Sequence, residues 1–227
     1  MESGNLPVDG GSLYYEMHGN HGPPFLLIAG GSGTTTMCSR LAITLATHFH
    51  VISYDRRGTP RSCPFPLPRQ SDTLRTHAED AATFLMRTFP GIPAIIFTTS
   101  GSTAIALELV NQTRLQCPEN HLDVGISWST MPTSWKSYYE HELPAIVDYA
   151  PNPDSLARTH LKIYVVEGSV EVPVFVQETI LGVSELLGRP PFRIAWGHVG
   201  YATHAEFRGS LITLLCNGNG GKVNLRY

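Results

Sequence analysis

The sequence has little charge of either sign. Its 227 residues include 16 Lys and Arg against 19 Asp and Glu, and charged residues make up 15% of the chain. No basic block or stripe occurs, which argues against nucleic acid as a partner, because binding to a phosphate backbone requires clustered Lys and Arg. With 42% hydrophobic residues, the composition is that of a globular protein with a rather apolar surface.

Long hydrophobic runs and clustered cysteines are also missing. No apolar run is long enough to span a membrane, and the first residues lack the charged-then-apolar arrangement of a signal peptide. The four cysteines (Cys38, Cys63, Cys117 and Cys216) are scattered without a CxxC pair, so we expect reduced thiols rather than disulfides or a zinc site. These absences predict a cytoplasmic protein with no membrane partner, metal or cofactor.

Strand patterns alternate with helical patterns along the chain. Strands are expected at 13–17 (as an edge strand), 25–29, 50–54, 94–99, 124–128, 162–166 and 192–196. Helices are expected at 36–47, 71–89, after residue 101, at 173–187 and at 204–216. This alternation predicts a single α/β domain over 1–227, with a mostly parallel sheet covered by helices on both faces.

The most informative stretch is 94–109. A β-branched and aromatic run stops at a cluster of small polar residues around Ser100, and an apolar helical pattern follows at once. This strand–turn–helix context is the one in which a serine is presented as a nucleophile. A serine hydroxyl needs a base and nearby oxyanion donors to react. Alternatively Ser100 is an ordinary turn residue, and Thr99 and Ser102 are the other candidate hydroxyls.

His198 is the candidate base. It follows the last predicted strand in a glycine-flanked loop and stands in the chain order Ser, acid, His. It would take the proton of Ser100 and later return it to the leaving group. A lone histidine is more often a surface or core residue, and His204 is assigned to the cap of the following helix.

Four segments resemble motifs of the α/β-hydrolase superfamily, and the resemblance covers roughly residues 8–216. Ala29–Gly33 is similar to the HGGPG-type oxyanion loop, and Tyr54–Ser62 to the YDxRGxGxS segment. Thr98–Ser102 occupies the nucleophile elbow, and Gly197–Tyr201 resembles the histidine loop of the esterase- and proline-iminopeptidase-like branch. The resemblance implies the α/β-hydrolase fold and a Ser-His-acid triad.

The acid of that triad is implied by position. Relatives carry it three residues after a glycine that ends a strand, which places it at Glu171, after Gly168. Glu167, directly before that glycine, and the more distant Glu178 remain alternatives. Glu171 also precedes a proline-started helix, where a glutamate suits the helix dipole without any catalytic role.

The resemblance further implies an oxyanion hole and a pocket. The amides of Gly31 and Gly101 would be the oxyanion donors, although the glycines of the first loop also suit a plain tight turn. Aromatic side chains would line the substrate pocket; the residues are Trp128, Trp135 and Tyr201. Trp128 and other aromatics nearby equally suit packing under a lid.

The chain departs from the family pattern in three places. Thr98 and Ser102 replace both glycines of G-x-S-x-G, and Ala29 replaces the usual oxyanion-loop histidine. Residues 130–160 leave room for only a short lid-like insertion. We expect a serine hydrolase, monomeric or homodimeric, acting on a small uncharged ester, lactone, thioester or amide. The alternative is a degenerate member that binds a small molecule, or catalyses cyclisation, isomerisation or elimination with His198 as base.

Overall fold

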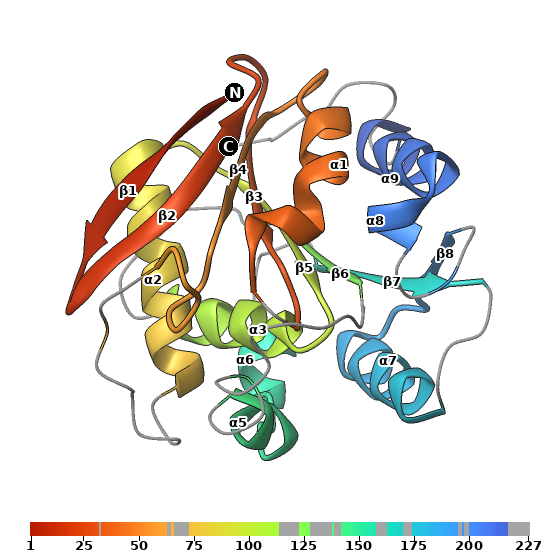
Figure 1. Ribbon diagram of the computed structural model, residues 1–227. Helices are drawn as coiled ribbons and strands as arrows, with labels where there is room; N and C mark the ends of the chain where they lie inside the picture. The colour runs from red at the N-terminus through yellow and green to blue at the C-terminus, as the bar shows by residue number, and fades with distance from the viewer. Residues whose placement is uncertain are drawn as a thin grey trace.

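The computed structural model describes residues 1–31, 33–62, 65, 73–113, 123–127, 138, 142–157, 163–169, 174–194, 197 and 200–217. Within these residues, helices lie on both sides of one eight-stranded sheet (Figure 1). The strands are β1 (Glu2–Val8), β2 (Gly11–His18), β3 (Pro24–Ile28), β4 (His50–Tyr54), β5 (Ile95–Thr99), β6 (Asp123–Ser127), β7 (Ile163–Gly168) and β8 (Phe192–Ile194). The helices are α1 (Thr35–Leu45), α2 (Thr73–Thr88), α3 (Ser102–Thr113), α5 (Leu143–Val147), α6 (Pro153–Ala157), α7 (Val174–Leu187), α8 (Gly200–Thr203) and α9 (Ala205–Asn217).

The strand order is β1-β2-β4-β3-β5-β6-β7-β8. β1 and β2 form an antiparallel hairpin, β2 pairs antiparallel with β4, and every pair from β4 to β8 is parallel. The prediction of a mostly parallel α/β sheet is therefore confirmed. Because parallel strands end at the same edge of a sheet, the segments that follow β3, β4, β5, β7 and β8 all start at one edge.

A strand is present at the predicted residues 13–17, but the prediction that it lies at the edge of the sheet is wrong. Residues 13–17 lie within β2, which is covered on its outer side by β1 (Glu2–Val8). The sequence of β1 contains Gly, Asn and Pro instead of a β-branched run. Such residues are depleted in strands, and a proline is tolerated on an edge strand, so no strand signal was visible there.

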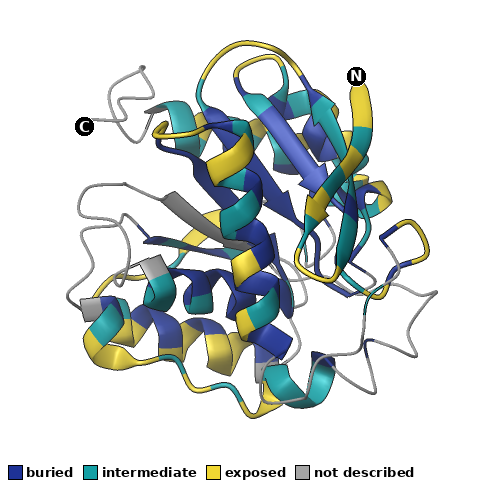
Figure 2. Cartoon of the chain, turned by 90° about the vertical axis from the view of Figure 1, so that its left-hand side faces the viewer, coloured by how far each residue is buried: buried dark blue, intermediate teal, exposed yellow. Residues whose placement is uncertain are grey.

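Two hydrophobic clusters cover the two faces of the sheet. One joins the strands to α2, α3, α6 and α7, and the other joins them to α1, α8 and α9. Figure 2 shows buried residues on the sheet and on the inner sides of the helices, with exposed residues on the outer sides. The continuous apolar runs of β3 and β5 are buried throughout because both of their faces are covered.

Candidate active site

Ser100 lies on a sharp turn between β5 and α3. Its φ is 54°, and it is the one non-glycine residue with positive φ in the described part of the chain. The left-handed region is unfavourable for a residue with a Cβ atom, and such strain concentrates at functional sites. β5 ends at Thr99 and α3 begins at Ser102, so the turn holds Ser100 at the sheet edge, where it is partly exposed.

Two neighbouring hydroxyls support this turn. The Ser102 Oγ accepts a hydrogen bond from the Thr99 amide at 2.9 Å and lies 2.7 Å from the carbonyl oxygens of both Ile28 and Thr99. The Ser102 hydroxyl carries one hydrogen atom, so it can donate to only one of these two carbonyl oxygens at a time. Thr99 and Ser102 are 0% and 1% exposed. Burial and these contacts give both residues a structural role, which favours Ser100 as the reactive hydroxyl.

The missing glycines do not prevent the turn from forming. Thr98 is a buried residue of β5 that pairs with Ile28 of β3 and Ile126 of β6, so it has the extended backbone that a β-branched residue prefers. Ser102 stands where helix and strand approach closely. Its side chain is small enough to fit there, and its hydroxyl bonds across the gap.

The loop after β3 contacts the turn directly. The Gly30 amide donates to the Thr99 Oγ1 at 2.8 Å, and the Gly33 amide donates to the Gly30 carbonyl at 2.9 Å. A Cβ added at Gly30 would overlap the Thr99 carbonyl oxygen and lie 2.7 Å from the Ser100 Cβ. The loop that carries the candidate donor Gly31 is therefore packed against the candidate nucleophile.

Arg56 holds this loop from behind. The guanidinium, 1% exposed, donates to the carbonyl oxygens of Ala29 and of Gly31 (2.8 Å), and to the Glu142 Oε2 at 2.6 Å. Its own amide donates to the Gly33 carbonyl at 2.8 Å. Through these four contacts, the charged guanidinium and the backbone of Arg56 order the loop after β3.

The helix α5 packs on the other side of the turn. A Cβ added at Gly101 would lie 2.5 Å from the Cδ1 of Ile146, a residue of α5, and 3.3 Å from the hydroxyl of Tyr138. Both residues belong to the stretch 130–160, in which we expected a lid-like insertion. Tyr138 and Ile146 of that stretch thus lie against Gly101, the residue that follows Ser100.

A buried histidine completes this region. The His77 Nε2 lies 3.7 Å from the Glu142 Oε1. Burial lowers the pKa of His77 well below its ordinary value, and the positive charges of Arg56 and Arg57 lower it further. His77 is therefore neutral, which leaves the Arg56–Glu142 pair electrically balanced. Sequence reasoning missed His77 as a polar contact; the available signal was a histidine on the apolar face of the helix predicted at 71–89.

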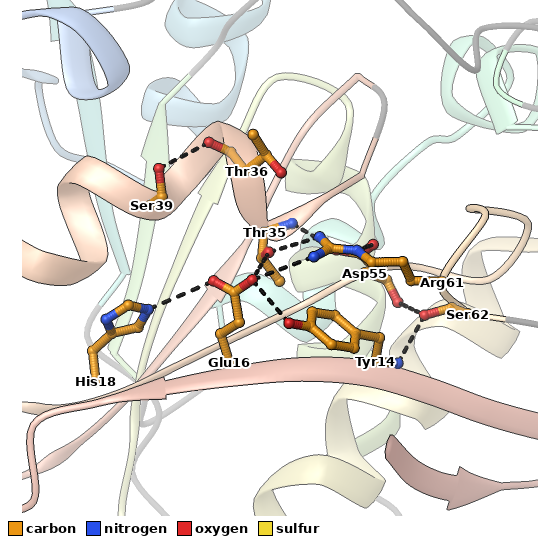
Figure 3. Close-up of polar contacts among 9 residues, drawn as sticks. All are labelled: Tyr14, Glu16, His18, Thr35, Thr36, Ser39, Asp55, Arg61 and Ser62. Carbon is orange, nitrogen blue, oxygen red and sulfur yellow. Dashed lines mark hydrogen bonds and ion pairs between the residues drawn. The ribbon is translucent and has the colours of Figure 1, made fainter. Parts of the chain in front are cut away.

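A second polar network closes the loop after β4 onto β2 and α1 (Figure 3). The buried Asp55 carboxylate accepts hydrogen bonds from the Thr35 amide at 2.7 Å and from two nitrogens of Arg61, each at 2.8 Å. The Glu16 carboxylate accepts from the Thr35 hydroxyl at 2.8 Å and lies 3.7 Å from the His18 Nε2. Asp55 thereby occupies the N-terminus of α1, where a negative charge is favourable.

Four predicted site residues lie outside the described residues: Trp128, Trp135, Glu171 and His198. Residues near Glu171 and His198 are described. The Ser169 amide donates to the Ile194 carbonyl at 3.0 Å, so β7 and β8 end side by side, and the Gly200 amide donates to the Gly197 carbonyl at 2.9 Å.

The structure describes the positions of three other predicted site residues, Glu167, Glu178 and Tyr201. Glu167 pairs with Arg193 at 3.0 Å, and Glu178 is exposed on α7. Tyr201, expected at the substrate pocket, is 0% exposed in the core, where its ring packs edge-on near Phe97 and Phe207.

Cys38 and Cys216 are free thiols, and burial raises the pKa of the Cys38 thiol to about 12; Cys63 and Cys117 lie outside the described residues. No group of three or more His, Cys, Asp or Glu side chains in the described ranges is arranged to hold a metal ion. The helices of those ranges are all too short or too polar to cross a membrane.

Comparisons with known proteins agree with this architecture. No family model matches the chain. An uncharacterized hydrolase of Bacillus subtilis (strain 168), YraK, is 35% identical over 111 residues, which span 48% of this chain and 39% of YraK. The chain thus covers well under half of that relative's length.

Solved structures resemble almost the whole chain. The esterase RhEst1 from Rhodococcus sp. ECU1013 is 15% identical with a TM-score of 0.70, covering 96% of this chain and 99% of RhEst1. Est816, an N-acyl homoserine lactone degrading enzyme, is 17% identical with a TM-score of 0.66 (92% and 99% covered). The N-acyl homoserine lactonase AidH is 18% identical with a TM-score of 0.68 (97% and 98% covered). The chain has the α/β-hydrolase fold.

Proposed function

We propose that this protein is a serine hydrolase in which Ser100 attacks the carbonyl carbon of a small uncharged ester, lactone, thioester or amide. The left-handed backbone of Ser100, with φ of 54° at the junction of β5 and α3, carries the proposal. Strain of this kind at a polar residue on the ligand-binding edge of a parallel sheet suits a nucleophile elbow. The structural likeness to an esterase and to two lactone-degrading enzymes supports this reaction class.

The proposed reaction has two halves. The Ser100 Oγ forms a bond to the carbonyl carbon while His198 accepts the hydroxyl proton, and the Gly31 and Gly101 amides stabilise the oxyanion. His198 then donates the proton to the leaving oxygen, sulfur or nitrogen, which departs and leaves an acyl-enzyme. Water, deprotonated by His198, then attacks the acyl carbon. His198 returns that proton to the Ser100 Oγ as the bond between the acyl carbon and Oγ breaks, which releases the carboxylic acid and regenerates Ser100. Glu171 accepts a hydrogen bond from His198 and orients it.

A small and uncharged acyl group suits the described surroundings. Ile146 of α5 presents an apolar methyl group beside Gly101, and the positive charge of Arg56 is neutralised by Glu142. Ile146 therefore presents no charge to a substrate, and the charges of Arg56 and Glu142 compensate each other. Trp128 and Trp135 are the proposed aromatic walls of the pocket.

Short p-nitrophenyl esters and a fluorophosphonate probe test the proposal. The wild-type protein should hydrolyse the esters and bind one probe molecule covalently, and both properties should be lost in Ser100→Ala. Ser39→Ala, which removes an exposed hydroxyl on α1, is the control and should retain both. Labelling that persists in Ser100→Ala would contradict the nucleophile, and turnover that needs His198 but not Ser100 would favour base-catalysed chemistry.

The acid can be tested separately. Glu171→Gln should reduce kcat strongly, whereas Glu167→Gln, which only removes a pair with the exposed Arg193, should leave kcat within about twofold of wild type. The opposite ranking would move the acid to Glu167.

A further inference from the structure

We propose that Arg56 is a positioning residue for the oxyanion hole, and that Glu142, directly before α5, holds Arg56 in its working position. The inference rests on the proposed function and concerns how the donor of Gly31 is aimed. Neither residue is placed to touch the substrate, because both are buried, at 1% and 6% exposure.

The peptide planes of the loop after β3 are held by hydrogen bonds to their carbonyl oxygens. The carbonyls of Ala29 and Gly31 both point to the Arg56 guanidinium, and the carbonyl between them, of Gly30, accepts from the Gly33 amide. Three successive carbonyls are therefore held. In a trans peptide the N–H points opposite to the C=O. Fixing the Gly30 carbonyl toward Gly33 thus directs the Gly31 N–H the other way, and Arg56 secures the peptides on either side.

This loop has little stiffness of its own. Gly30 and Gly31 carry no side chains, and Gly31 adopts a φ of 47°. Glycine reaches a wide range of backbone conformations, so a peptide between two glycines rotates easily unless hydrogen bonds hold it. An oxyanion donor acts through preorganisation, which means that external contacts must supply the rigidity.

Glu142 supplies the other end of the clamp. Its carboxylate accepts from Arg56 at 2.6 Å in a buried setting, where a charged pair keeps its geometry because neither partner has a water alternative. One turn further along, Ile146 of α5 packs against the position of Gly101, the second candidate donor. The segment formed by Glu142 and α5 therefore contacts both halves of the oxyanion hole, one through Arg56 and the other directly.

The neighbouring Arg57 provides a matched control. It also makes an ion pair with a buried carboxylate, donating to Asp80 at 2.5 and 2.7 Å, and it donates to the Asp9 carbonyl at 2.9 Å. These contacts join α2 to the hairpin of β1 and β2, away from the oxyanion loop. Arg56 and Arg57 thus make the same kinds of contact, with a buried carboxylate and with backbone carbonyls. They differ in the segment that they hold, which is the loop after β3 for Arg56 and the hairpin of β1 and β2 for Arg57.

The experiment compares Arg56→Lys, Glu142→Gln and Arg57→Lys with the wild-type protein. Lysine keeps the charge but lacks the planar fork that reaches two carbonyls and a carboxylate together. Active sites are counted by fluorophosphonate labelling at completion, so that kcat refers to correctly folded protein. A trifluoromethyl ketone that resembles the ester measures binding of the tetrahedral state.

For Arg56→Lys we expect kcat per labelled site to fall about 10- to 100-fold, below the roughly 10²- to 10³-fold loss for deleting an oxyanion donor. KM should change by less than about twofold, and affinity for the ketone should fall by the same factor as kcat. Glu142→Gln should show the same pattern with a smaller loss. Arg57→Lys should lower the melting temperature and leave kcat and ketone affinity unchanged.

Equal kcat in Arg56→Lys and wild type, or a loss that appears only in KM, would overturn the inference. A loss of the same size in Arg57→Lys would also overturn it, because general destabilisation would then explain the effect. If Arg56→Lys does not fold, Glu142→Gln decides by the same criteria. A wild-type protein that neither hydrolyses esters nor takes the probe would overturn the proposed function itself, and this inference with it.

Discussion

The side-chain oxygen of Thr99 accepts a hydrogen bond from the amide of Gly30 at 2.8 Å. This contact joins the end of β5 to the loop after β3, two segments that are 69 residues apart in the sequence. The residue before the candidate nucleophile thus anchors the loop that carries a candidate oxyanion donor, so this hydroxyl helps to set the relative position of the two.

Replacing that hydroxyl should affect both stability and activity. Thr99→Val keeps the shape but leaves the buried Gly30 amide without its acceptor, which should cost about 1–3 kcal/mol in the free energy of unfolding. It should also lower ester hydrolysis, because the loop loses its anchor. Thr99→Ser retains the acceptor and is the control. Urea denaturation and kcat measurements test this, and a Thr99→Val protein that matches wild type in both would contradict it.

The two glycines that flank the turn should respond differently to a methyl group. Gly30→Ala meets the Thr99 backbone and the Ser100 Cβ, which have no room to move, so it should destabilise by about 3 kcal/mol, the upper part of the usual range for overpacking. Gly101→Ala meets the flexible end of Ile146 and should cost only about 1 kcal/mol.

A second substitution checks the cause. Ile146→Val removes the Cδ1 that Gly101→Ala would meet, so the double variant should lose less stability than the sum of the two single changes. No such coupling is expected between Gly30→Ala and Ile146→Val. If the losses of stability from Gly101→Ala and Ile146→Val simply add, Ile146 is not the side chain that the new methyl group at Gly101 meets.

The network around the loop after β4 should depend more on Asp55 than on Glu16. Asp55→Asn leaves one acceptor oxygen for the Thr35 amide and two nitrogens of Arg61, and should cost about 2–3 kcal/mol, as for hydrogen bonds to a charged group. Glu16→Gln keeps an oxygen that can accept from the Thr35 hydroxyl, and should cost less than about 1 kcal/mol. Thermal or urea unfolding measures the loss of stability in each variant. Equal losses in Asp55→Asn and Glu16→Gln would contradict the larger role of Asp55.

His77 should make stability fall as the pH falls. In the unfolded chain it titrates near its ordinary pKa of 6.5, whereas burial and then Arg56 and Arg57 hold its pKa well below that value in the fold. Below pH 6.5 the unfolded state therefore binds a proton that the folded state does not, and the free energy of unfolding decreases.

Urea unfolding between pH 7.5 and 5.5 measures this effect. The variant His77→Gln should show a smaller decrease, by up to about 1.4 kcal/mol per pH unit below pH 6.5. Burial raises the pKa of Asp80, which acts in the opposite direction, but its ordinary value of 3.8 keeps that effect nearer the acid range. Equal slopes for wild type and His77→Gln would show that the fold does not lower the pKa of His77.

Much of the architecture was predictable because it is encoded locally. The apolar runs of β3 and β5 and the helical spacing at 71–89 depend on burial patterns within a few residues, and each produced the expected element. The turn at Ser100 was predictable for the same reason, since a strand, small polar residues and a helix follow one another directly. β1 was missed because its sequence lacks a strand pattern and it depends on pairing with β2.

The alternation of the main strands and helices, the turn that holds Ser100 and the glycine loop after β3 thus followed from the sequence alone, whereas β1 and the short helices α5, α6 and α8 did not. Only the tertiary structure decided which partners the polar residues take. Arg56 and Arg57 are adjacent and chemically alike, yet Arg56 binds the loop after β3 and Glu142, whereas Arg57 binds Asp80. Side-chain direction sets that difference, and the partners come from segments distant in the chain. Local patterns specify helices and strands, whereas long-range packing specifies which side chains meet.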